Sequence, residues 1–331
     1  MVVLFMKASV PTLSGRLLRK VPGVAVDRTT ATPPENPSNA HRDHVMRGMA
    51  AAMGAHFMFS IMVVLAKLLS ENHSVIEIAF YRNLIASVPF FFAIFVLGRR
   101  GFLHLNTKPL LVGFRAVLGS ISLPITFWAY SLMPLADTTA LLFTSSLFVP
   151  VLAVLILKET VGPYRWSAVV VGFAGVIVMA RPTGDVYVLG ITIVMCAALF
   201  HATLQIVLRY LGRYESPETV SFYFFVVGTL ITGAAMPFVA VTPTMEEIPL
   251  LLGVGVSGGI AQWLLTVAFK YAPAALVTVF NYTSIVWATM FGWMIWNEWP
   301  LPAVMVGASV VIASNMLIIW RESRLHKAAS N

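Results

Sequence analysis

The sequence predicts an all-α integral membrane protein with ten transmembrane helices arranged as two inverted five-helix repeats. Three observations support this prediction: a membrane-like composition, ten apolar runs of spanning length, and a sequence pattern that recurs 139 positions later. The composition argues against a water-soluble fold. Of the 331 residues, 58% are hydrophobic and only 11% are charged, whereas soluble domains carry about 25% charged residues.

Residues 1–46 differ from the rest of the chain. They contain five prolines and several basic residues, and they show little hydrophobic periodicity. We interpret them as a disordered basic tail, because such a segment cannot bury enough apolar surface to fold.

From Gly48 onward, apolar runs approach the roughly 20 residues that a helix needs to cross the hydrocarbon core. Short connections rich in Gly, Pro, Asn and charged residues separate them. Helices are favoured because a lone membrane-spanning strand would leave its backbone unpaired. The predicted spans are 48–69, 76–97, 109–131, 138–157, 165–180, 187–208, 217–240, 249–269, 274–296 and 301–320.

The basic residues predict the orientation. If the N-terminal tail is cytoplasmic and the spans alternate, cytoplasmic segments hold 18 of the 22 Lys and Arg residues, and outer loops hold only Arg181. Membrane proteins carry this excess of positive charge on the cytoplasmic side. We therefore expect an inner-membrane protein of a bacterium with both termini cytoplasmic, including a tail at 322–331. The net charge of +8 then reflects orientation, and no nucleic-acid partner is expected.

An internal repeat explains the number of spans. The segment 140–159 matches 279–298 at an offset of 139 without a gap, and further upstream the offset becomes 142. Each repeat therefore covers five spans, at 48–181 and 187–321. Because five is odd, the second repeat must cross the membrane in the opposite sense. Inverted repeats of this kind place a binding site near the midplane and support alternating access.

Several short motifs within the first repeat resemble the drug/metabolite transporter superfamily, in its EamA-like branch. The resemblance covers roughly residues 48–321, and it implies a ten-helix carrier with a central cavity lined by spans one, three, four, six, eight and nine. It also implies a substrate among amino acids, vitamins such as riboflavin, S-adenosylmethionine, nucleotide sugars or cationic drugs. The motifs are Trp128-Ala129-Tyr130-Ser131-Leu132-Met133-Pro134-Leu135-Ala136, Leu157-Lys158-Glu159-Thr160-Val161-Gly162, Arg165-Trp166, Gly172-Phe173-Ala174-Gly175-Val176 and Arg181-Pro182.

The candidate substrate-binding residues are polar or aromatic side chains within the spans. Ionisable groups inside a membrane are costly and mark functional sites, although each can also serve packing or reach a headgroup. Two arginines without charged repeat mates could bind an anion, and two histidines could take part in proton coupling. The candidates are His56, Ser60, Arg82, Arg115, Trp128, Thr144, His201, Gln205, Gln262, Trp263, Phe280, Asn281, Tyr282 and Thr283.

Rings and amides together suit a polar organic solute, because rings stack on flat partners and amides read hydrogen-bonding edges. The leading hypothesis is therefore a secondary transporter that takes up a riboflavin-like vitamin or heterocycle. The alternatives are an exporter of amino acids or related metabolites and drugs, an S-adenosylmethionine transporter and, more remotely, a membrane-embedded enzyme. Glu159 and Glu298 are expected to cap or pair near loop residues rather than to bind the solute.

The sequence offers little support for an enzyme. It contains no HExxH motif, no acid pair within a span and no Walker A sequence, and Cys196 is the only cysteine. No cofactor or metal is therefore expected, and the partners are a small-molecule solute and the lipid bilayer.

Pairs of small residues four positions apart, such as Gly255 with Gly259, and Ala303 with Gly307, allow helices to approach closely. Contacts within one chain are the simpler interpretation, and a dimer face is the alternative. We expect a monomer or a weak homodimer.

Overall fold

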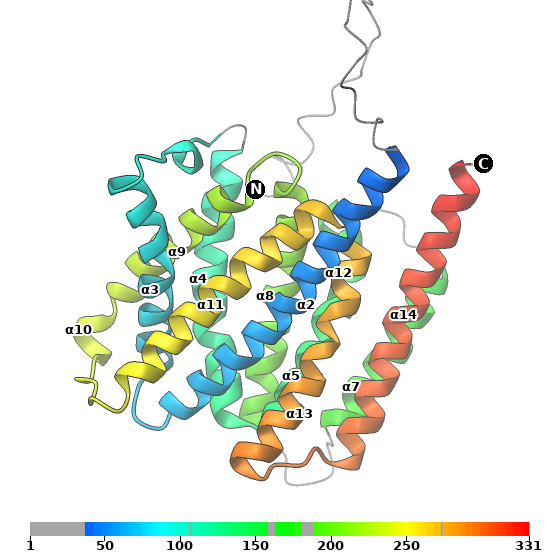
Figure 1. Cartoon of the computed structure of the whole chain (residues 1–331). Helices are drawn as coiled ribbons and strands as arrows, with labels where there is room; N and C mark the ends of the chain where they lie inside the picture. The colour runs from blue at the N-terminus through cyan, green and yellow to red at the C-terminus, as the bar shows by residue number, and fades with distance from the viewer. Residues whose placement is uncertain (1–36, 106–107, 158–162, 181–187, 273, 331) are drawn as a thin grey trace, which may run out of the picture.

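The computed structural model describes residues 37–105, 108–157, 163–180, 188–272 and 274–330, which form a bundle of helices without a strand in these ranges (Figure 1). Both described ends lie at the same end of the bundle. The elements are α2 (Pro37–Leu69), α3 (Val75–Phe95), the 3-10 helix η1 (Gly101–Leu103), α4 (Pro109–Leu132), α5 (Leu135–Leu142), α6 (Thr144–Leu157), α7 (Pro163–Ala180), α8 (Val188–Leu211), α9 (Pro217–Gly233), α10 (Met236–Val239), α11 (Ile248–Tyr271), α12 (Ala274–Asn281), α13 (Thr283–Trp296) and α14 (Pro302–Ser330).

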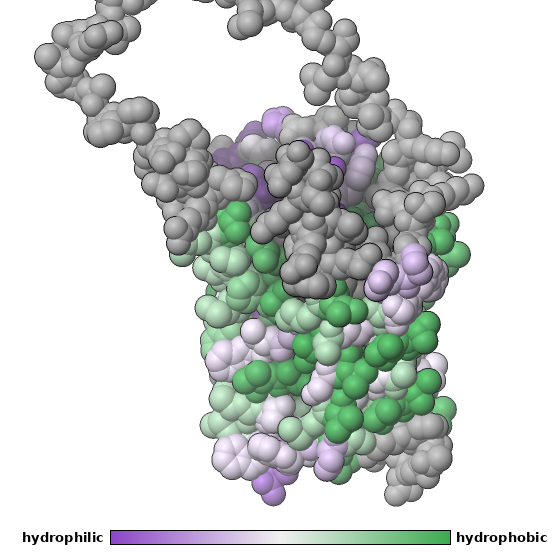
Figure 2. Space-filling model, turned by 90° about the vertical axis from the view of Figure 1, so that its right-hand side faces the viewer, coloured by the Kyte–Doolittle hydropathy of each residue, from purple (hydrophilic) through white to green (hydrophobic). Residues whose placement is uncertain are grey.

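Apolar composition and length together identify an integral membrane protein. Among the described residues, six helical segments are long and apolar enough to cross a membrane, and the shorter segments Trp166–Ala180 and Pro302–Leu317 are also apolar. Figure 2 shows a hydrophobic belt across the middle of one face, with hydrophilic residues gathered toward one end. This belt matches the lipid-facing surface that a spanning bundle requires.

Helix boundaries recur along the chain at the offsets found in the sequence. Both ends of α11 lie 139 residues after those of α4, and the same holds for α12 against α5 and for α13 against α6. The first residues of α14 and α7 also differ by 139. The first residues of α9 and α3 differ by 142, as do the last residues of α8 and α2.

Two predicted spans are broken, which corrects the prediction of continuous helices over 138–157 and 274–296. The first divides into α5 and α6 at Phe143, and the second into α12 and α13 at Tyr282. These two residues are repeat mates, and their rings meet edge to face with centroids 5.0 Å apart. The breaks therefore face each other where the two halves of the chain meet.

Other boundaries also differ from the prediction. Helix α2 begins at Pro37, inside the predicted tail, because proline fits the first turn of a helix and no further proline follows it before the first span. Helix α9 ends at Gly233 instead of near residue 240, and the short α10 follows with Pro237 in its first turn. The predicted roles of Glu159 and Arg181 fall outside the described residues.

Glycines allow helices within the chain to pack closely. A Cβ at Gly307 on α14 would lie 2.5 Å from the carbonyl oxygen of Gly175 on α7. A Cβ at Gly255 on α11 would lie 2.4 Å from Cβ of Ile85 on α3. Both glycines thus contact a neighbouring helix of the same chain, as the simpler interpretation of the small-residue pairs predicts.

An ion pair ties three segments together at the end of the bundle opposite the described termini. Lys67 Nζ, at the end of α2, lies 3.1 Å from Glu298, just beyond α13. Lys67 also donates to the carbonyl oxygen of Met133 at 3.2 Å, and Glu298 accepts from the backbone N–H of Leu135 at 3.3 Å. Glu298 thus pairs near loop residues, as the sequence predicted.

Candidate solute-binding cavity

A cavity of about 210 Å³ lies between the two halves of the chain. Its walls come from α2, α3, α4 and α5 in the first half, and from α8, α9, α11, α12 and α13 in the second. These helices include all six spans that the family resemblance implied, while α3 and α9 each add one residue, Arg82 and Phe224.

One face of α4 supplies a polar stripe to the cavity. Arg115, Gly119, Ser122, Thr126 and Tyr130 follow one another at intervals of three or four residues, and all five line the cavity. Side chains at these intervals share one face of a helix. The stripe covers about four turns of α4, from Arg115 to Tyr130.

Polar side chains from the second half complete the cavity. His201 Nε2 on α8 lies 3.0 Å from Thr126 Oγ1, so this contact joins the halves. One turn further, Gln205 Nε2 donates to Ser145 Oγ at 3.4 Å. On α11, Gln262 Nε2 donates to Thr266 Oγ1 at 3.3 Å.

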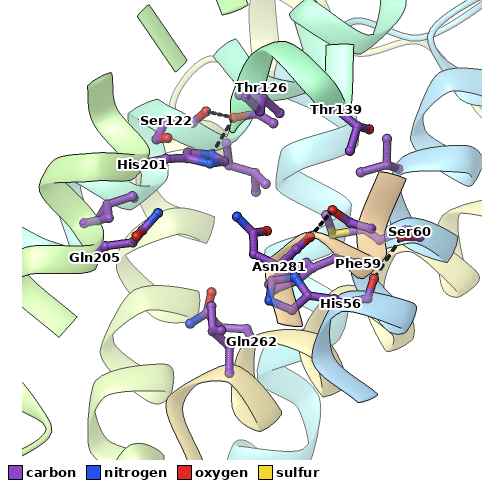
Figure 3. Close-up of a pocket in the computed structure, with 18 of the residues that line it drawn as sticks. His56, Phe59, Ser60, Ser122, Thr126, Thr139, His201, Gln205, Gln262 and Asn281 are labelled. Atoms are coloured by element: carbon purple, nitrogen blue, oxygen red, sulfur yellow. Dashed lines mark hydrogen bonds between the residues drawn. The ribbon is translucent and has the colours of Figure 1, made fainter. Parts of the chain in front are cut away.

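Asn281 occupies a central position among these groups. It is the last residue of α12, directly before the break at Tyr282. Figure 3 shows its amide reaching into the cavity, with His201 and Gln205 on one side and Gln262 on another. The break in the helix thus brings a hydrogen-bonding amide into the space between the halves.

Two cavity residues are buried arginines, Arg82 on α3 and Arg115 on α4, which are only 1% and 2% exposed. Their guanidinium carbons lie 5.1 Å and 4.1 Å from the centre of the Phe224 ring. Two cations therefore share one aromatic ring at the cavity wall.

Eight of the fourteen predicted site residues line the cavity: His56, Ser60, Arg82, Arg115, His201, Gln205, Gln262 and Asn281. Thr144, Phe280, Tyr282 and Thr283 lie near it, at or beside the helix breaks, without lining it.

The prediction that Trp128 and Trp263 line the cavity is corrected. Neither residue is among those that line the cavity, and the two are 43% and 42% exposed. Other rings line the cavity instead, among them Phe59, Phe143 and Phe269.

Several cavity residues were not among the predicted site residues, including Ser122, Thr126 and Thr139. Each of the two threonine hydroxyls also bonds a carbonyl one turn earlier, Thr126 to Ser122 and Thr139 to Leu135. Such local bonds are common in apolar helices and carry no functional signal. The usable signal is the spacing of Ser122 and Thr126 relative to Arg115.

Relatives of the chain are transporters of bacteria. The chain is 29% identical over 276 residues to a pseudopaline exporter of Pseudomonas aeruginosa, covering 82% of this chain and 95% of the relative. It is 27% identical to an S-adenosylmethionine uptake transporter of Rickettsia bellii, with coverages of 79% and 89%. It is 28% identical to a riboflavin transporter of Rhizobium johnstonii, with coverages of 63% and 70%.

The fold also occurs among solved structures. One crystal structure superposes with a TM-score of 0.60 at 16% identity, covering 85% of this chain and 99% of its own. The sequence model of the EamA-like transporter family matches the chain twice, over residues 46–181 and 188–320. These two matches span both halves of the bundle and the cavity between them, and the protein belongs to the EamA-like transporter family.

Proposed function

We infer that the protein carries a small polar organic solute across the membrane by alternating access between two inverted five-helix halves, 48–181 and 187–321. The observation that carries this proposal is the polar cavity, because both halves supply its walls. The recurring helix boundaries and the contact between the repeat mates Phe143 and Tyr282 support a pseudo-twofold relation. Rocking one half against the other would expose such a cavity to each side in turn.

The lining favours a solute that offers both a ring and hydrogen-bonding edges. The amides of Gln205, Gln262 and Asn281 can donate and accept without demanding a charge. Phe143 and Phe269 offer ring faces in the same space. A riboflavin-like heterocycle meets this description, although the outward position of Trp128 and Trp263 removes two of the rings on which that hypothesis rested.

Uptake into proteoliposomes tests the proposed function. The panel contains riboflavin, S-adenosylmethionine, amino acids and nucleosides, each with and without a proton gradient. We expect saturable uptake of at least one member above empty liposomes. Saturable uptake of none of these classes would overturn the proposed solute class.

Replacing Asn281 with alanine is expected to weaken the apparent affinity for the transported solute. Loss of the central amide would leave a polar group of the solute without a partner in a buried site. This costs about 1–3 kcal/mol, which corresponds to a roughly five- to 150-fold weaker apparent affinity. Concentration dependence of uptake measures this change. The matched control is Trp263→Ala, whose outward position predicts uptake like that of the parent. Impaired uptake in the control together with normal uptake in Asn281→Ala would contradict the site.

Cysteine labelling tests the proposed topology. In a Cys196→Ser background, Met46→Cys lies near the start of the first span and Met245→Cys lies in the loop before α11, where the methionines are 52% and 85% exposed. We expect a membrane-impermeant maleimide to label position 245 in intact cells and position 46 only after permeabilisation. Labelling of both positions from outside would refute ten spans with both termini cytoplasmic.

A further inference from the structure

The arginine pair of the cavity, Arg82 and Arg115, has no matching negative charge among the residues that the structure describes. No carboxylate among the described residues lies within 4.0 Å of either guanidinium. Glu77, five residues before Arg82, is directed elsewhere: its oxygens accept from the backbone N–H of Val241 at 3.3 Å, and one lies 3.2 Å from His73 Nδ1. Two positive charges inside a membrane without a counter-ion are costly.

Arg82 is held in place. Its Nη1 donates to Asn83 Oδ1 and its Nη2 to the carbonyl oxygen of Gly258, both at 2.8 Å. The glycine provides the necessary space, because a Cβ at position 258 would lie 2.6 Å from Arg82 Nε. These contacts agree with a packing role for this arginine, which is also one of the residues that line the cavity.

Arg115 is not held in this way. Its Nε and Nη1 are buried and have no hydrogen-bond partner among the described residues. Its guanidinium lies 4.1 Å from the Phe224 ring, whose face attracts a cation but cannot accept both N–H groups. Buried donors without acceptors are rare, because each costs about 1–3 kcal/mol. Because Arg115 lines the cavity, an acceptor that enters from the cavity would satisfy these donors.

We propose that the transported solute carries an anionic group, a carboxylate or a phosphate, which binds Arg115 beside the fixed charge of Arg82. The planar fork of a guanidinium matches both groups, and ionised partners form the stronger hydrogen bonds. Arg82 adds a second positive charge, while the amides and rings of the cavity contact the remainder of the solute. This inference rests on the proposed transport function and narrows its substrate class.

Binding measurements test the inference without requiring transport. The probes are matched pairs that differ in the anionic group: nicotinate against nicotinamide for a carboxylate, and riboflavin 5′-phosphate against riboflavin for a phosphate. The readout is the thermal unfolding midpoint of the full chain in neutral detergent, because a ligand of the folded state raises it. We expect the anionic member of at least one pair to act at a roughly tenfold or more lower concentration than its neutral partner.

Three variants assign the effect. Arg115→Gln should abolish the preference for the anionic probe, whereas Arg115→Lys, which keeps the charge but loses the fork, should retain part of it. The matched control is Arg213→Gln, because Arg213 is exposed and does not line the cavity. A parent that does not distinguish the members of either pair, or an Arg115→Gln variant that still does, overturns the inference.

A lipid phosphate is the competing source of the same chemistry. Adding phosphatidylglycerol to the detergent tests this alternative. A stabilisation by this lipid that depends on Arg115, without any response to the soluble anions, assigns the arginine to a lipid contact and overturns the inference. The proposed transport function and the proposed anion binding can be refuted independently. Uptake by Asn281→Ala tests the first, and the anion preference of Arg115→Gln tests the second.

Discussion

Reversing the charge of Lys67 or of Glu298 alone is expected to destabilise the protein, and reversing both is expected to restore much of the loss. In Lys67→Glu, two carboxylates would meet where Nζ now lies 3.1 Å from both oxygens of Glu298. The carbonyl oxygen of Met133 would lose its donor, and the ring of Trp296 would lose the cation 4.8 Å from its centre.

The expected size follows from burial. The side chains of Lys67 and Glu298 are 11% and 29% exposed, so the pair lies between the weak exposed bridges and the fully buried ones. Breaking a fully buried pair costs about 3–5 kcal/mol, and an exposed pair contributes about 0–1 kcal/mol. We therefore expect a loss of about 1–3 kcal/mol for each single reversal, measured by thermal unfolding in detergent.

A double-mutant cycle separates this pair from unrelated effects of charge. Lys67→Glu combined with Glu298→Lys should recover at least half of the loss, because the attraction is restored with its sign exchanged. The control is Arg99→Glu, an exposed residue beyond α3, which should leave the midpoint nearly unchanged. Additive losses in the double variant would show that the two residues do not stabilise each other.

Most of the helix positions could be predicted because the membrane imposes a simple rule on sequence. A helix must remain apolar over roughly 20 residues. Because the pattern occurs in both repeats, the boundaries in one repeat support those predicted in the other. The breaks at Phe143 and Tyr282 could not be predicted in this way. Neither proline nor glycine marks them, and the polar residues beside them, such as Asn281 and Thr283, do not by themselves end a helix.

The candidate site was predictable to the extent that it is polar. Asn281, Gln262 and His201 stand out because an amide or imidazole is rare in an apolar helix. The directions of Trp128 and Trp263 could not be predicted, because a spanning helix is apolar on its lipid face and on its packed face alike. Periodicity separates inside from outside only where one face is polar.

The largest effect on stability is expected where α7 crosses α14, at Gly307. A Cβ at this position would lie 2.4 Å from Met179 Cγ and 2.5 Å from the backbone oxygen of Gly175. A methionine side chain can move, but a backbone oxygen moves only with its helix. Gly307→Leu should therefore force the two helices apart and lower the free energy of unfolding by about 3 kcal/mol or more.

Two alanine variants show whether this loss comes from the crossing. Gly175→Ala would place a Cβ 2.8 Å from the carbonyl oxygen of Gly307. A methyl group at either glycine would therefore obstruct the same close approach of α7 and α14. Once one methyl group has separated the helices, the second should cost less. The double variant Gly175→Ala/Gly307→Ala should therefore lose less stability than the sum of the two single variants. Gly113→Ala is the matched control, because its added Cβ would have no heavy atom within 4 Å apart from the backbone of its own helix and its chain neighbours.

The same variants distinguish contact within the chain from a dimer face, the alternative that the small-residue pairs left open. If Gly307 serves the crossing of α7 and α14, Gly307→Ala lowers the thermal midpoint at every protein concentration and leaves the oligomeric state unchanged. If it serves a dimer, the loss depends on protein concentration, and light scattering detects a change in mass. Because the closest backbone atom belongs to Gly175 of the same chain, we expect the concentration-independent loss.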